Sequence, residues 1–120
     1  MPINRAWEQF TSEVIKLLPI RESGVYEIGR ARGNVVLCIG QSSRSIRGRL
    51  LSHQKETRFT VCTHFRKRKT SPEKAADTET RLLSEFIKKY GRLPLLNTNY
   101  TLGRDAFGRY FWGPPLRRII

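Results

Sequence analysis

The sequence predicts an α/β (α+β) fold in which helices are layered against a small mixed or antiparallel sheet. The chain has 120 residues, a length typical of one domain. Hydrophobic residues make up 38% of it, which is enough for a packed core. Helix-like and strand-like patterns follow one another in the order helix, strand, strand, helix, strand, helix and tail. We therefore expect a single domain over residues 1–120.

The first forty residues predict one helix followed by a β-hairpin. Residues 4–18 carry apolar side chains at helical spacing, with Asn4 as the N-cap and Pro19 ending the helix. Residues 24–29 and 35–40 are rich in β-branched side chains. The segment between them contains a glycine and an asparagine, which tolerate positive φ, so the two runs are predicted to pair as a hairpin.

The middle of the chain predicts a short helix and a third strand. Residues 45–55 have a helical pattern, with Ser43 or Ser45 as the N-cap. Residues 58–66 alternate in the manner of a strand and are followed by a basic loop at 67–70.

A long helix is predicted over residues 72–90, because Ser71 and Pro72 form a typical helix start and Gly91 a typical stop. The tail at 98–120 is basic and aromatic but lacks a clear period, so we expect it to be loop-like.

Positive charge is concentrated in one segment. The chain holds 23 Lys and Arg against 10 Asp and Glu, a net charge of +13. Residues 41–70 contribute nine basic residues and one acidic residue, a net of +8. A charge of this size and focus favours a phosphate-binding surface over a solvated face or a membrane-surface patch. The expected phosphate contacts are Arg47, Lys55, Arg58, Arg66, Lys67, Arg68 and Lys69, with Arg104, Arg109, Arg117 and Arg118 of the tail as additions.

Several classes of protein are excluded. No stretch of about 20 apolar residues is present, so we expect no membrane span, and the first 18 residues do not resemble a signal peptide. Cys38 and Cys62 form no CxxC motif or disulfide framework, which favours a reduced, cytoplasmic environment. Together with His53 and His64 they match no structural zinc spacing, and we expect them to be packed thiols.

One carboxylate lies on an apolar helix face. On a helical wheel of ~100° per residue, Glu79 falls in the middle of a stripe made by Ala75, Ala76, Leu82, Leu83, Phe86, Ile87 and Tyr90. An ionised carboxylate is costly to bury unless it is paired or binds a metal. Glu79 is therefore either the partner of a structural arginine or a functional group.

The predicted helix at 45–55 presents two further polar groups. Ile46 and Leu50 define its inward face, and Arg49 and His53, four residues apart, flank that face. An Arg, a His and a Glu that meet beside a tyrosine-bearing hairpin form a constellation suited to phosphodiester cleavage. In it the Glu holds a divalent metal, the Arg stabilises phosphate charge, and the Tyr or His handles the proton.

Five separated motifs, in order over residues 23–97, resemble the GIY-YIG nuclease family. They are Gly24-Val25-Tyr26, Cys38-Ile39-Gly40, the segment from Arg47 to His53, Glu79-Thr80-Arg81-Leu82-Leu83 and Leu93-Pro94-Leu95-Leu96-Asn97. Any one of these motifs alone would be a weak signal, but the five together are specific.

The resemblance implies a small three-stranded antiparallel sheet flanked by helices, and metal-dependent hydrolysis of DNA phosphodiester bonds. Tyr26 would help to activate the attacking water, and Arg49 would stabilise charge on the scissile phosphate. His53 would assist the proton relay or orient Tyr26. Glu79 would be the single protein ligand of Mg²⁺ or Mn²⁺, and Asn97 would support the geometry of the site.

The chain departs from the family pattern at Cys38, which stands where the second signature tyrosine is found. Two alternatives stand beside an active nuclease, and the departure at Cys38 motivates the first. One is a GIY-YIG-like module that binds nucleic acid without cutting it, and the other is a basic interaction protein in which Glu79 is salt-bridged. Cutting both DNA strands with one active centre would need a homodimer or a second binding event.

Overall fold

A four-stranded antiparallel sheet forms the centre of this fold, with the strand order β1-β4-β2-β3. The computed structural model describes residues 3 and 5–97, and the backbone of 101–104 and 110–113. The strands are β1 (Glu8–Gln9), β2 (Gly24–Arg30), β3 (Val35–Ser42) and β4 (His64–Lys69). The helices are α1 (Ser12–Ile15), α2 (Ile46–Gln54), the 3₁₀ helix η1 (Thr57–Val61) and α3 (Pro72–Tyr90). The predicted α+β class is therefore confirmed, with one more strand in the sheet than the three expected.

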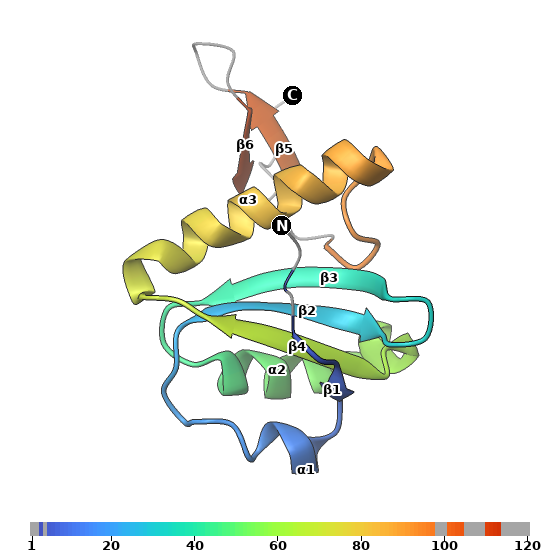
Figure 1. The fold of residues 1–120 in the computed structure, drawn as a ribbon, viewed down its shortest axis with the longest axis vertical. Helices are drawn as coiled ribbons and strands as arrows, with labels where there is room; N and C mark the ends of the chain where they lie inside the picture. The colour runs from blue at the N-terminus through green and yellow to red at the C-terminus, as the bar shows by residue number, and fades with distance from the viewer. Residues whose placement is uncertain (1–2, 4, 98–100, 105–109, 114–120) are drawn as a thin grey trace.

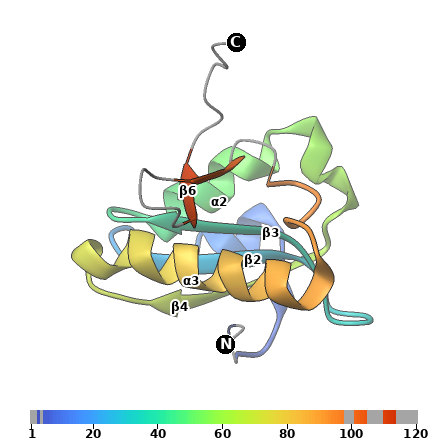
Figure 2. The same ribbon diagram turned by 90° about the horizontal axis from the view of Figure 1, so that it is seen from above.

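The sheet separates two layers of helices. Helix α3 covers one face and follows the direction of the strands, whereas α2 and α1 lie on the opposite face (Figures 1 and 2). Successive side chains of a strand point to opposite faces, so the side chains of β2 pack into a hydrophobic core on each face of the sheet. Tyr26 packs in the cluster that contains Leu50 of α2, and its neighbour Val25 packs in the cluster that contains Leu82 and Leu83 of α3.

Local signals predicted four of these elements well. The hairpin of β2 and β3 forms as expected, and Gly33 and Asn34 in its turn have φ values of 80° and 53°. Ser45 caps α2 by accepting a hydrogen bond from the backbone of Gly48 at 2.9 Å. Helix α3 spans the predicted residues and ends at Gly91 in the left-handed region, with a φ of 75°.

The prediction of a helix over residues 4–18 is wrong. This segment instead forms β1 and the short helix α1, which Thr11 caps. Strand β1 pairs with β4 through Glu8 and Phe65, a contact between distant parts of the chain. The apolar residues of the segment do not form one helical face, because Phe10 is buried whereas Leu17 is 84% exposed.

The third predicted strand is misplaced. Residues Thr57–Val61 form the 3₁₀ helix η1, and β4 begins only at His64. The basic run expected as a loop therefore lies in a strand between β1 and β2. The alternation that suggested a strand does not mark a buried face, since Phe59 is 2% exposed but Val61 is 50% exposed.

Part of the C-terminal tail is also more regular than expected. Strand β5 (Thr101–Arg104) pairs antiparallel with β6 (Tyr110–Gly113) in a separate two-stranded sheet. The side chain of Arg104, and all of Arg109, Arg117 and Arg118, lie outside the described residues, so their expected phosphate contacts stay predictions. Among the described residues, no helix has the length and apolar character needed to cross a membrane.

Candidate active site

Tyr26 and His53 meet between the sheet and α2, as the sequence predicted. The Tyr26 hydroxyl lies 2.8 Å from Nε2 of His53, and both side chains are buried. Tyr26 reaches this position because it points to the α2 face of β2, and His53 because it follows the inward-facing Leu50 by three residues in α2. The contact joins the first resemblance motif to the third.

Gly40 makes room for the tyrosine ring. It is the residue of β3 that pairs with Tyr26, and a Cβ built on it would lie 2.3 Å from the tyrosine hydroxyl oxygen. No side chain fits at that distance, so the ring crosses β3 only because residue 40 is a glycine.

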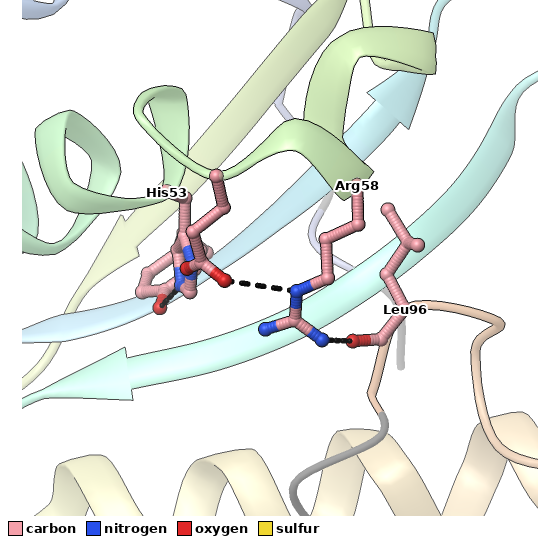
Figure 3. A network of polar contacts seen from close by, with 5 residues as sticks. His53, Arg58 and Leu96 are labelled. Atoms are coloured by element: carbon pink, nitrogen blue, oxygen red, sulfur yellow. Dashed lines mark hydrogen bonds and ion pairs between the residues drawn. The ribbon is translucent and has the colours of Figure 1, made fainter.

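Behind His53 the contacts continue through two residues of the segment after α2 (Figure 3). Nδ1 of His53 lies 2.8 Å from Oε1 of Glu56, and Nε of Arg58 donates to Oε2 of the same carboxylate at 2.9 Å. A terminal nitrogen of Arg58 also donates to the backbone oxygen of Leu96 at 2.8 Å. The chain of contacts thus runs from Tyr26 to the segment that precedes Asn97.

Sequence reasoning missed Glu56 and the contacts that Arg58 makes with it. Glu56 is the one acidic residue among residues 41–70 and follows His53 by three positions, a signal that could have identified it. Arg58 was expected to contact phosphate. Its guanidinium bonds to Glu56 and to the Leu96 carbonyl, because η1 turns the chain back toward α2. Arg58 also lines the cavity beside His53, so its phosphate contact stays a prediction.

The pKa shifts of this network fix the direction of its hydrogen bonds. Burial lowers the pKa of His53 and outweighs the opposing effect of Glu56, so the imidazole is neutral near pH 7. Burial acts to raise the pKa of Glu56, but hydrogen bonds from His53 and Arg58 bring it below its ordinary value, so the carboxylate is ionised. An ionised carboxylate only accepts hydrogen bonds. Nδ1 of His53 therefore carries the proton, and Nε2 accepts the hydrogen bond that Tyr26 donates.

A small cavity opens beside this pair. Its volume is about 20 Å³, close to the space that one water molecule needs. The lining residues are Tyr26, Cys38, Ile39, Gly40, Arg49, His53, Arg58, Leu96 and Asn97. Burial raises the pKa of Tyr26 well above its ordinary value, while the charge and hydrogen bonding of Arg49 act to lower it. The structure thus gathers four of the five predicted catalytic residues around one water-sized space.

Asn97 holds the edge of the sheet next to the cavity. Its side-chain oxygen accepts a hydrogen bond from the Ile39 backbone at 2.8 Å, and its side-chain nitrogen donates to the Ile39 carbonyl at 2.7 Å. Because β3 is an edge strand, this pair of bonds replaces what a further strand would supply. Asn97 is buried and acts on the backbone of β3.

Glu79 comes to this region from α3, on the other face of the sheet. It is 5% exposed and shares the buried side of α3 with Ala75, Thr78, Leu82 and Leu83, which confirms that the carboxylate faces inward. Ala76 and Tyr90, also assigned to this stripe, are exposed. Glu79 does not line the cavity, but its charge adds to the effect of burial in raising the pKa of Tyr26 and Cys38.

A single carboxylate fits the metal expected here, because Mg²⁺ commonly takes one or two protein carboxylates and completes its shell with water and phosphate oxygens. A site built from several protein ligands is not found, since the described residues contain no group of three or more His, Cys, Asp or Glu side chains suited to a metal.

Cys38 lines the cavity as a neutral thiol. Both cysteines are free and buried, and burial raises the pKa of Cys38 to about 12. The thiol is therefore protonated at neutral pH and is neither a nucleophile nor a strong hydrogen-bond donor.

No protein-family model, curated protein or solved structure matches this chain. The GIY-YIG resemblance comes from the chain's own motifs, and the function must be argued from the site.

Some of the basic residues expected to contact phosphate are held by acidic side chains of the protein, and the others are exposed or partly exposed. Arg66 is 7% exposed, and its Nε donates to Oε1 of the buried Glu27 at 2.7 Å, with its guanidinium stacked on Trp7. Its expected phosphate contact is therefore corrected, because β4 directs this side chain under α3 rather than to solvent. Lys67 bonds to Glu22. The other members of the group are exposed (Lys55 and Lys69) or partly exposed (Arg47 and Arg68).

Proposed function

We propose that this protein is a metal-dependent endonuclease of the GIY-YIG type, which hydrolyses DNA phosphodiester bonds. The observation that carries the proposal is the 2.8 Å contact between the Tyr26 hydroxyl and His53, with Glu56 behind the imidazole and a water-sized cavity beside it. A phenol that donates to a neutral imidazole can pass on a proton as it takes one up.

The proton path follows from the protonation states. The attacking water gives a proton to the Tyr26 oxygen while Tyr26 gives its own proton to Nε2 of His53. Because burial raises the pKa of Tyr26, a free phenolate is costly, and the simultaneous transfer to His53 avoids forming one. The imidazolium that results is stabilised by the Glu56 carboxylate at 2.8 Å.

Residues other than Tyr26 and His53 would stabilise the negative charge on the scissile phosphate. Arg49 is exposed at the mouth of the cavity and would stabilise the negative charge that develops on the scissile phosphate. Glu79 would hold the Mg²⁺ or Mn²⁺ ion, whose contribution when bound is to neutralise phosphate charge. Asn97 keeps β3, and with it Gly40, in the position that Tyr26 needs.

Cys38 favours a second candidate, a GIY-YIG-like module that binds nucleic acid without cutting it. Its protonated thiol is a weak donor and does not replace the hydroxyl of the family's second tyrosine. Such a module would keep the basic surface that binds nucleic acid but would not cleave phosphodiester bonds.

A cleavage assay separates the two candidates. Plasmid and branched DNA are incubated with Mg²⁺ or Mn²⁺ and with the wild type, Glu79→Ala or Asp77→Ala, the last being an exposed acid of the same helix. The nuclease proposal expects cleavage by the wild type and Asp77→Ala and none by Glu79→Ala. If the wild type cuts no substrate but binds DNA in a salt-sensitive manner, the nuclease proposal fails and the binding module is the better candidate.

The setting of the reaction is also a proposal. DNA is the partner, and double-strand cleavage calls for a homodimer or for two successive binding events. A reduced, cytoplasmic compartment suits a chain whose two cysteines are buried free thiols.

A further inference from the structure

A groove of about 750 Å³ lies at the end of the hairpin where β2 begins and β3 ends. Its walls come from residues 20–23, from the turn at 43–45 and from Pro72 at the start of α3. Arg21 projects from the first wall and Arg44 from the second, and both are exposed. None of the basic residues in the phosphate-binding expectation lines this groove.

The groove is positively charged. Glu22 is the one carboxylate in its lining, and that carboxylate is bonded by Lys67. The exposed Lys69 lies at the same end of the sheet, since it pairs with Gly24 at the start of β2. Arg21 and Arg44 come from two adjoining segments, which pair through Glu22 and Ser45. Two arginines placed in this way suit a phosphate, because each guanidinium can donate two parallel hydrogen bonds to it.

The walls of the groove are fixed to one another. The backbone of Ile46 donates to the Glu22 carbonyl at 3.0 Å, and the Ser45 hydroxyl donates to the Ile20 carbonyl at 2.7 Å. Thr70 donates to the Ser23 carbonyl at 3.0 Å, which ties in the segment before α3. These bonds hold the backbone on both sides of the groove before any ligand binds, so that little ordering accompanies binding.

The groove and the candidate active site share helix α2. Ser45 caps the helix at the groove, and Arg49 lies four residues further on, about 6 Å along the axis at 1.5 Å per residue. Successive phosphates of one strand advance by about 3.4 Å along B-DNA. For a strand that follows the axis of α2 with its scissile phosphate at Arg49, a phosphate about two nucleotides away lies at the level of the groove.

We propose that this groove binds the DNA backbone beside the cleavage site, with Arg21 and Arg44 contacting its phosphates. The position relative to the scissile phosphate rests on the proposed nuclease function, but the binding itself does not. DNA is favoured over an anionic membrane because three serines and two arginines line the site, and the exposed Ile20 is the one large aliphatic side chain among its lining residues.

The test is DNA binding by the full chain without divalent metal. Fluorescence anisotropy of a short labelled duplex is measured over a range of salt concentrations for the wild type, Arg21→Glu, Arg44→Glu and Arg32→Glu. Arg32 is exposed in the turn at the other end of the hairpin, so its variant has the same change in net charge. Each groove variant is expected to lose about tenfold or more in affinity and about one unit of salt slope, and Arg32→Glu much less.

Three results would overturn the proposal. Equal losses in all three variants would mean that only net charge matters. Tighter, Arg44-dependent binding of duplex RNA or of phosphatidylserine vesicles would assign the groove to another partner. A loss of affinity in Arg44→Glu that comes with a lowered melting temperature and an altered far-UV circular dichroism spectrum would assign the loss to a folding defect.

The cleavage assay distinguishes failure of this inference from failure of the nuclease. If the wild type cuts DNA but Arg44→Glu binds it normally, the groove proposal falls and the nuclease stands. If no cleavage occurs but the groove variants lose DNA affinity, the groove stands and the nuclease falls.

Discussion

The hydroxyl of Tyr26 lies 2.8 Å from Nε2 of His53, and the ring reaches that point by crossing Gly40 on the neighbouring strand. The contact places a buried phenol between a base and a water-sized cavity. The charge of Glu56 on the far side of His53 decides which atom donates. These residues form the part of the site whose geometry is most fully determined, and the first three predictions concern them.

Replacing Glu56 by Gln should slow cleavage and change its pH dependence. Glu56 acts to raise the pKa of His53 against the larger effect of burial, so removal of its charge lowers that pKa further. Because His53 must be neutral to accept a proton, the acid limb of the pH–rate profile should move to lower pH. The imidazolium also loses its partner, and the plateau rate should fall by roughly tenfold or more. An unshifted acid limb would contradict this positioning role, and Glu13→Gln, an exposed acid of α1, is the control.

The stability of the fold should decrease as the pH falls below about 6.5. Burial lowers the pKa of His53 in the folded state below its ordinary value of 6.5. The unfolded chain then binds more protons in this range, so the stabilisation is present above pH 6.5 and lost as the pH falls through the folded pKa. Chemical denaturation at several pH values should show this decrease in the wild type and in His64→Gln. The share of this decrease in stability that His53 causes should be missing from His53→Gln. An identical pH dependence of stability in all three proteins would count against a contribution from His53.

Replacing Gly40 by Ala should destabilise the protein and impair cleavage together. The new Cβ would lie 2.3 Å from the Tyr26 oxygen, so the ring or strand β3 must move. Overpacking of this kind costs about 1–3 kcal/mol. Thermal unfolding and cleavage rate are the measurements, and an unchanged melting temperature would show that the ring does not depend on the missing side chain.

Arg66→Ala should be strongly destabilising and should leave the salt dependence of DNA binding unchanged. Removing the guanidinium leaves Glu27, which is 2% exposed, with a carboxylate that has lost its ion-pair partner. Breaking such a pair costs about 3–5 kcal/mol. Lys69→Ala, an exposed change in the same strand, is the control and should cost little stability. A smaller salt slope for folded Arg66→Ala would mean that Arg66 does contact phosphate.

The sequence predicted what local chemistry determines and failed where distant pairing decides. Caps and periodicity located α2 and α3, and the wheel placed Glu79 on the buried side, because the hydrogen bonds of a helix join residues close together in the chain. Strand β1 could not be found this way, since two residues become a strand only through Glu8 and Phe65 on distant segments. Arg66 was assigned to solvent for a similar reason, because only the register of β4 against β2 sets it opposite Glu27.

In the candidate site, too, the contacts that depend on local structure could be predicted, and those that depend on the path of the chain between elements could not. The proximity of Tyr26, Arg49 and His53 could be predicted from the sequence, because the hairpin and one helical wheel determine the faces on which these side chains lie. Glu56 could not, since its contact with His53 depends on how the chain leaves α2 and enters η1. Cys38 is the residue of the site that favours the binding module, because its protonated thiol is a weak hydrogen-bond donor.

Proton transfer through Tyr26 during DNA cleavage is tested most directly by the single-turnover cleavage rate of Tyr26→Phe in Mg²⁺. This variant keeps the ring in place over Gly40 and removes only the hydroxyl. Cleavage by this variant is expected to fall by roughly 10²-fold or more, while salt-dependent DNA binding stays at the wild-type level. Cleavage by Tyr26→Phe at the wild-type rate would contradict proton transfer through Tyr26.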